Sequence, residues 1–302
     1  MAPVAGDAQS VAGAGQGCGA ALRVALRRGG DGYPQELLDL PHPPATLWAR
    51  GNLSVLAQPC VAIVGTRRAT PYATRVAREL GRSLARAGAC VVSGLARGVD
   101  AEAHRGALDV GGATCAVLGT GLDVVFPKGH AQLQADIAAR GLLLSELEPQ
   151  HAAHRGSFPN RNRIIAALSK ATIVVEAPLL SGALITSRVA FELGRSVGAI
   201  PGPIDVPQSQ GSNEVLRDYG CAITSITDAI TLMGLNAPIR LAELPEGSPE
   251  RRMWEALADG AADLDTLCTR SRLPAHEGMA AVSALELRGL VECALTGEIR
   301  RS

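Results

Sequence analysis

The stretch VAIVGTRRATPY, at residues 61–72, joins a short apolar run to a glycine turn and a helix start. The run VAIVG, residues 61–65, is continuously apolar, which is typical of a strand buried on both faces. Thr70 and Pro71 then supply an N-cap residue and a proline for the first helical turn. The stretch therefore predicts a βα unit whose strand lies inside a sheet.

The same pattern recurs along the chain. The apolar runs that we expect to be strands are residues 61–65, 90–93, 114–119, 142–146, 171–177, 197–202 and 221–224. The helices that we expect between and after them are residues 70–88, 100–110, 130–139, 160–168, 183–194, 213–218 and 226–233. Repeated βα units predict an α/β fold with a doubly wound, mostly parallel sheet, whose ligands bind at the loops that follow the strands.

The segments outside this repeat suggest four parts. We expect residues 1–30, rich in Gly and Ala, to be a low-complexity tail or a reduced N-terminal domain, and residues 31–235 to form the sheet domain. Residues 236–249 read as a linker, and residues 250–302 as three helical segments and a hairpin, typical of a small winged-helix module. Its third helix carries Glu277, Glu286 and only Arg288, which favours contact with protein or packing in a dimer over contact with DNA.

Composition limits the class of protein. With 47% hydrophobic and 19% charged residues, the chain of 302 residues is expected to fold. Its seven cysteines are odd in number and never spaced as C-x-x-C, which argues against a disulfide framework or a zinc site and for the cytoplasm. No apolar run approaches the roughly 18 residues of a membrane span, and no secretory signal is evident. We expect no metal, no cofactor and no membrane partner.

The net charge of zero conceals an uneven distribution. Residues 61–235 carry 17 basic and 14 acidic groups, whereas residues 236–302 carry 8 and 11. The segment HAAHRGSFPNRNRIIAALSK, residues 151–170, holds Arg155, Arg161, Arg163 and Lys170 and no acid, with Phe158 among them. Cations around an aromatic ring suit single-stranded nucleic acid, because guanidinium groups pair with phosphates while the ring stacks on a base. The alternative is a solvated basic helix start with Phe158 in the core.

Several of the expected βα loops are rich in glycine. They are Gly65-Thr66-Arg67, the stretch SGLARGVD at residues 93–100, Gly119-Thr120-Gly121 and Ser181-Gly182. Backbone N–H groups in such loops, together with helix N-termini, bind anions, although the glycines could equally serve only tight turns. No loop completes a dinucleotide-binding or P-loop motif. Several such loops on one sheet edge favour a ligand that carries phosphate.

Two sets of polar residues allow a catalytic interpretation. Asp100 and His104, four residues apart on one expected helix, could form an acid/base pair or half a metal site. The structural alternative, in which Asp100 caps the helix and His104 hydrogen-bonds nearby, is favoured because no third ligand is evident. Glu176 and Glu192 could act in general acid/base catalysis or pair with arginines, and pairing is favoured.

These motifs, in this order, resemble the DprA/Smf family, the DNA-processing proteins of bacterial natural transformation. The resemblance runs from Tyr33 to about Gly234 and includes VAIVGTRRAT, SGLARGVDAEAH, TCAVLGTGLDVVFP and FPNRNRIIAALS. The C-terminal module is similar to the winged-helix end of many members. The resemblance implies an extended Rossmann-like domain that binds single-stranded DNA without cleaving it, dimerises and loads RecA onto the strand.

The resemblance also implies a site. Arg67 and the segment from Arg155 to Arg163 would line a DNA pocket, with Phe158 stacked on a base, Arg155 at a phosphate, and Ser93, Gly94 and Arg97 beside them. With the loop residues, the expected single-stranded DNA contacts are Gly65, Thr66, Arg67, Ser93, Gly94, Arg97, Arg155, Phe158, Arg161, Asn162, Arg163, Lys170, Ser181 and Gly182.

Two other functions stay open. A related Rossmann-like group hydrolyses nucleotide N-glycosidic bonds with a PGGxGT…E motif. Here the matching stretch reads PLLSGALITSRVAFE, residues 178–192, without the glycine pair, and Arg188 and Glu192 would be the catalytic pair. A transcription regulator that reads duplex DNA through the winged-helix module is the other alternative.

Overall fold

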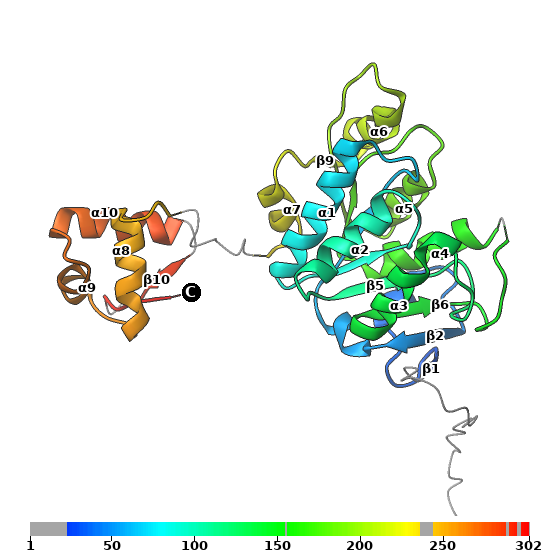
Figure 1. Ribbon diagram of the computed structural model, residues 1–302, viewed down its shortest axis with the longest axis horizontal. Helices are drawn as coiled ribbons and strands as arrows, with labels where there is room; N and C mark the ends of the chain where they lie inside the picture. Colours follow the sequence, from blue (N-terminus) through cyan, green and yellow to red (C-terminus); the bar gives the residue numbers. More distant parts are fainter. Residues whose placement is uncertain (1–22, 155, 236–243, 288–289, 295–296, 302) are drawn as a thin grey trace, which may run out of the picture.

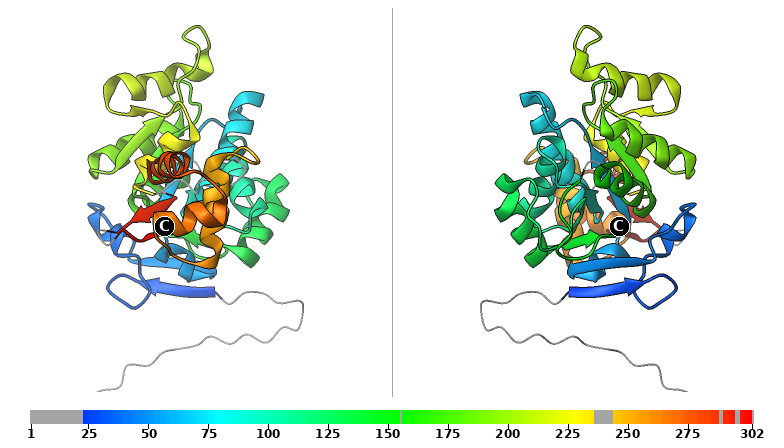
Figure 2. Two further views of the ribbon diagram at one scale, coloured as in Figure 1. Left: turned by 90° about the vertical axis from the view of Figure 1, so that its left-hand side faces the viewer. Right: turned by 90° about the vertical axis from the view of Figure 1, so that its right-hand side faces the viewer.

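The structure is a computed structural model that describes residues 23–154, 156–235, 244–287, 290–294 and 297–301. Residues 23–235 form a sheet of nine strands with helices on both faces (Figures 1 and 2). Residues 244–301 form a separate small module, described below by itself. No helix in the described ranges is long and apolar enough to cross a membrane.

The large sheet is mostly parallel. In spatial order its strands are β1 (Arg23–Arg27), β2 (Thr46–Gly51), β6 (Leu142–Ser145), β5 (Thr114–Val117), β4 (Cys90–Ser93), β3 (Cys60–Val64), β7 (Ala171–Val174), β8 (Ser196–Ala199) and β9 (Cys221–Ala222). Strands β3 to β9 pair in parallel, and β2 pairs antiparallel with both β1 and β6. The chain builds outward from β3 to β6 on one side, then returns to place β7 on the other side of β3. The carboxyl ends of β3 and its neighbours are therefore the switch point where such sheets bind ligands.

Both faces of the central strands are buried, as the continuous apolar runs predict. Val61 and Ile63 of β3 pack in the core under one layer of helices, whereas Ala62 and Val64 pack under the other. The first layer contains α1 (Pro71–Arg86), α2 (Val99–Asp109), α3 (Ala131–Arg140) and α7 (Ile226–Leu232). The second contains α4 (Ser157–Leu168), α5 (Gly182–Glu192) and α6 (Gln210–Asp218). The predicted doubly wound architecture is confirmed.

One edge of the sheet differs from the prediction. β1 lies within the segment expected to be a low-complexity tail, and β2 lies in the proline-punctuated stretch after it. In β2 only Leu47 and Ala49 are buried, in alternation with partly exposed residues, so this strand lacks the continuous apolar run of the central strands. Residues 1–22 lie outside the described part of the chain.

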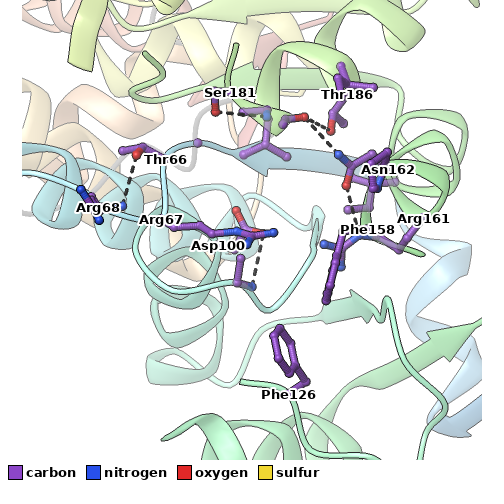
Figure 3. Close-up of a pocket in the computed structure, with 18 of the residues that line it drawn as sticks. Thr66, Arg67, Arg68, Asp100, Phe126, Phe158, Arg161, Asn162, Ser181 and Thr186 are labelled. Atoms are coloured by element: carbon purple, nitrogen blue, oxygen red, sulfur yellow. Dashed lines mark hydrogen bonds between the residues drawn. The ribbon is translucent and has the colours of Figure 1, made fainter. Parts of the chain in front are cut away.

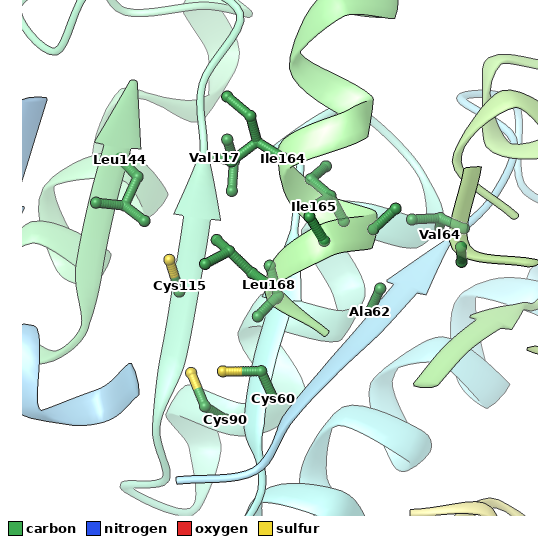
Figure 4. Packing of buried hydrophobic residues seen from close by; sticks show 14 of the residues in the cluster. Cys60, Ala62, Val64, Cys90, Cys115, Val117, Leu144, Ile164, Ile165 and Leu168 are labelled. Carbon is green, nitrogen blue, oxygen red and sulfur yellow. The ribbon is translucent and has the colours of Figure 1, made fainter. Parts of the chain in front are cut away.

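Three cysteines lie in the second-layer core on adjacent strands. Cys60, Cys90 and Cys115 come from β3, β4 and β5, and Cys60 and Cys90 are register partners (Figure 4). Burial raises the pKa of the Cys115 thiol well above its ordinary value. Their neighbours include Leu144, Ile164 and Leu168. All six cysteines in the described ranges are free thiols.

The C-terminal module has the predicted order of three helices and a hairpin. Its elements are α8 (Pro249–Ala256), α9 (Leu264–Ser271), α10 (Ala275–Leu287), β10 (Val291–Cys293) and β11 (Ile299–Arg301). Leu244, in the expected linker, is 1% exposed and belongs to the module's own core. Residues 236–243 of that linker lie outside the described ranges.

Candidate nucleic-acid interface

A cavity of about 820 Å³ opens at the carboxyl ends of β3 and its neighbours (Figure 3). We call it the edge cavity. Its walls come from the turn after β3, the start of α4 and the first turns of α5. Eight residues predicted from sequence line it: Gly65, Thr66, Arg67, Phe158, Arg161, Asn162, Ser181 and Gly182. Residues that are far apart in the chain are thus brought to one opening by the parallel topology.

The turn after β3 requires glycine. A Cβ atom at Gly65 would lie 2.6 Å from Val99 Cγ2 and 2.8 Å from the carbonyl oxygen of Glu176. Beside it, Thr66 donates its backbone N–H to that same carbonyl at 2.7 Å, and its hydroxyl accepts from the Arg68 N–H at 3.1 Å. The turn is therefore fixed from both sides, while the side chains of Arg67 and Arg68 are exposed.

Phe158 lies on the cavity wall rather than in the core. It is half-buried, and its ring centroid is 5.1 Å from that of Phe126. The guanidinium carbon of Arg67 lies 5.4 Å from the Phe158 ring centroid. Phe126 is 40% exposed, and sequence reasoning did not single it out. Its signals were its place at the end of the family motif TCAVLGTGLDVVFP, residues 114–127, and in the stretch after the third predicted strand. Figure 3 shows the Phe126 ring next to the Phe158 ring, and the two planes are tilted by 37°.

Helix α4 starts earlier than expected, at Ser157 rather than Asn160. Pro159 thus lies inside the first turn, where its missing N–H costs no intrahelical hydrogen bond. The earlier start places Phe158 in the first turn, at the mouth of the cavity. Arg155, expected at a phosphate, lies outside the described residues.

Arg161 corrects part of the sequence prediction. It was expected to bind phosphate, but it is only 4% exposed, and its guanidinium donates to the backbone carbonyls of Gly94, at 2.6 Å, and Val117. It shares a helix face with Ile164, Ile165 and Leu168, a spacing that indicates the buried side of α4. Desolvation by burial lowers the pKa of Arg161 to about 10, so the group stays charged at neutral pH.

Arg161 holds the loops of the cavity in place. Its contacts join the loop after β4 to the end of β5. Its Nε also donates to Asn162 Oδ1 at 3.1 Å, and Asn162 Nδ2 donates to the Gly182 carbonyl at 3.0 Å. A Cβ atom at Gly94 would lie 2.4 Å from the Arg161 guanidinium, which explains the glycine there.

Asp100 does not cap α2 but accepts hydrogen bonds from the loop before it. Its Oδ2 accepts from the N–H groups of Gly94, at 3.1 Å, and Ala96, at 3.4 Å, whereas the N-cap is Gly98. Burial raises the pKa of Asp100, and the charge of nearby Arg161 opposes that shift. His104 hydrogen-bonds Thr114 at 2.7 Å, so its predicted structural role is confirmed.

Three further predicted contacts lie away from the cavity. Ser93 is fully buried and donates its hydroxyl to the Ile63 carbonyl at 2.6 Å. Arg163 pairs with Glu146 and donates to the His42 carbonyl at 2.8 Å. Lys170 precedes β7, at the opposite end of the sheet from the cavity. The positive charge of residues 151–170 is therefore less concentrated at the cavity than the sequence predicts. Glu146 neutralises Arg163, and Lys170 lies at the other end of the sheet.

The acids considered for catalysis do not lie together. Glu176 is 6% exposed and accepts hydrogen bonds from the backbone N–H of Thr70, at 2.9 Å, and from its hydroxyl, at 2.8 Å. The predicted pairing of Glu176 with arginine is thus wrong. Glu192 ends α5 and Arg188 stacks on Tyr219 at 5.3 Å, and neither lines the edge cavity. Within the described ranges, no group of three His, Cys, Asp or Glu side chains is placed to hold a metal ion.

The sequence model of the family described as "DNA recombination-mediator protein A" matches residues 25–234, the part that builds the sheet and its cavity. The chain belongs to this family. The family's winged-helix domain matches residues 238–294. A putative DNA processing protein from Mycobacterium tuberculosis is 39% identical over 262 residues, which cover 83% of this chain and 67% of the relative.

Two solved structures of the family are similar to this chain. DNA processing protein A from Streptococcus pneumoniae superposes with a TM-score of 0.67 at 39% identity, covering 69% of this chain and 73% of that one. The protein from Helicobacter pylori, whose structure was described for its single-stranded DNA binding mode, gives a TM-score of 0.63 at 35% identity, covering 69% and 94%. The expected membership in the DprA/Smf family is confirmed.

Proposed function

We propose that this member of the DNA recombination-mediator protein A family binds single-stranded DNA in the edge cavity. The observation that carries the proposal is the exposed arrangement of Phe158, Phe126 and Arg67: two rings and a guanidinium at one opening. An aromatic face stacks on any base, and an exposed arginine beside it neutralises a phosphate. At Gly65, Ser181 and Gly182 the backbone lines the cavity and a ligand can approach it closely. Arg161 positions the loop after β4 and the end of β5 rather than contacting DNA.

The proposal extends beyond binding to the use of the bound strand. The family description as a recombination mediator supports the further proposal that the protein loads RecA onto the strand it holds, in the cytoplasm, as a homodimer with two cavities. Two linked sites hold one strand more tightly than either does alone, because the second contact is intramolecular.

Replacing Phe158 by alanine should weaken binding of an oligothymidylate by about 5- to 150-fold, the effect of losing about 1–3 kcal/mol from one stacked base. Phe158 carries no charge, so the slope of log affinity against log salt should stay at the wild-type value, about −0.7 per phosphate neutralised. Fluorescence anisotropy titrations at several salt concentrations measure both quantities.

Phe191→Ala is the matched control. Phe191 is also an exposed phenylalanine, 49% exposed, but it packs on Tyr219 outside the edge cavity. Its variant should bind like the wild type. Equal affinity of the Phe158→Ala protein and the wild type would remove the stacking role, and preference for duplex DNA would remove the proposed function.

We also propose that the protein is not an enzyme. The separation of Arg188 and Glu192 from the edge cavity supports this over N-glycosidic hydrolysis. Incubation with nucleoside monophosphates should release no free base above the buffer control, as measured by chromatography. Release of base that Glu192→Gln abolishes would establish the hydrolase instead.

A further inference from the structure

A second cavity, of about 680 Å³, adjoins the edge cavity on the side of β4 and β5. We call it the side cavity. It is lined by the loops at residues 94–97 and 118–120 and by the segment 124–128. Of the residues predicted from sequence, Gly94 and Arg97 line this cavity and not the edge cavity. The proposed function leaves it without a role.

The two cavities share a wall. Arg67, Phe126 and Phe158 line both. The Phe158 ring centroid lies 5.1 Å from that of Phe126 and 5.4 Å from the guanidinium carbon of Arg67. Phe158 also closes against the loop after β5, since a Cβ atom at Gly119 would lie 2.7 Å from its ring. The aromatic pair is thus a partition with an opening on each side, not the end of a single pocket.

The side cavity has the chemistry of a nucleotide site. Its walls are apolar, with Leu95, Leu118, Val124 and Val125, and no acidic residue lines it. Arg97 and Lys128, both exposed, lie on its rim, and neither pairs with an acid in the described part of the chain. Apolar walls accept the face of a base, and unpaired cations at the rim attract the phosphates that flank it.

We propose that the side cavity holds the base next to the one stacked in the edge cavity, so that Phe158 and Phe126 separate two successive bases. Arg97 and Lys128 bind the phosphate that follows the second base along the strand. This inference rests on the proposed function and adds to it a second base site. The contact with each protomer then spans two bases of one strand, and no base-specific hydrogen bond is needed.

Oligothymidylates of one to six nucleotides test the assignment on the full-length protein. In the wild type, the step from thymidine monophosphate to the dinucleotide should raise affinity by about fivefold or more. Val125→Asp and Lys128→Glu should each abolish this step and leave monophosphate affinity within about twofold. Val125 is 38% exposed and Lys128 is exposed, so neither change removes a core side chain.

Lys170→Glu is the matched control for charge. Lys128 and Lys170 are the two lysines of the sequence, and Lys170 lies at the opposite end of the sheet. Its variant should keep the dinucleotide step. If both Val125→Asp and Lys128→Glu keep the rise in affinity from monophosphate to dinucleotide, the second base site is overturned. It is also overturned if these variants lose monophosphate affinity as strongly as dinucleotide affinity, because the first base would then bind in the side cavity. Failure of the wild type to bind any length would instead overturn the proposed function, and this inference with it.

Discussion

Replacing Arg161 by methionine should lower the free energy of unfolding by about 3–5 kcal/mol, the cost of removing one partner from a buried charged network. The guanidinium is 4% exposed and donates to the carbonyls of Gly94 and Val117. Methionine is unbranched and apolar, so it fills much of the space but leaves both carbonyls unpaired and removes a cation near Asp100. Equilibrium unfolding in urea, followed by circular dichroism, measures the loss.

Arg163→Met is the control that tests whether the loss of stability comes from the burial of Arg161 or from replacing any arginine of α4. This arginine lies two positions further along α4, and its pair with Glu146 is partly exposed, at 26% and 19% of the two side chains. A pair that keeps contact with water contributes less than a fully buried charged network, so the control should be clearly less destabilised than Arg161→Met. Similar losses in the two variants would contradict the positioning role of Arg161.

The parallel core could be predicted from sequence because its strands carry a signal that does not depend on their partners. Residues such as Val61 to Val64 are apolar in succession, and only a strand covered on both faces places every one of them in the core. β2 has no such signal. Its hydrogen bonds to β6 are set by tertiary pairing across about ninety residues, and its alternating burial was concealed by the prolines before it.

The site could be predicted in part for a similar reason. Loop positions depend on strand order, so Gly65, Arg67 and Ser181 were expected at one edge, where they lie. Whether a charged side chain faces the cavity, the core or an acid depends on residues far away in the chain, which the sequence does not place. Arg163 pairs with Glu146 of another loop, and Arg161 points into the core. Phe126 lies at the end of a quoted family motif and Lys128 directly follows it, but neither was assigned to the site from sequence.

His104 should make the protein less stable in acid. It is fully buried; Thr114 Oγ1, which donates to the Val91 carbonyl at 2.7 Å, accepts from His104 Nδ1. His104 Nε2 is buried without a described partner, so a proton there would be an unpaired charge. Burial first, then the charges of Arg161, His130 and Arg105, lower the pKa of His104 to about 3.

The direction of this pH effect depends on which state binds the proton. In the unfolded chain His104 titrates near its ordinary pKa of about 6.5, so between about pH 6.5 and pH 3 the unfolded state binds a proton that the folded state does not. The contribution of His104 to stability is therefore complete above pH 6.5 and falls by about 1.4 kcal/mol per pH unit below it, which amounts to about 3 kcal/mol at pH 4. Urea unfolding of the wild type and of His104→Asn, from pH 7 to pH 4, measures it. Asparagine keeps a donor for Thr114 but fills less of the imidazole's space, so the variant should be less stable than the wild type at pH 7. Because asparagine does not titrate, only the wild type loses the His104 contribution as the pH falls, and the two stability curves should converge. Parallel curves would mean that His104 is protonated in the folded protein, and would contradict its burial as a neutral group.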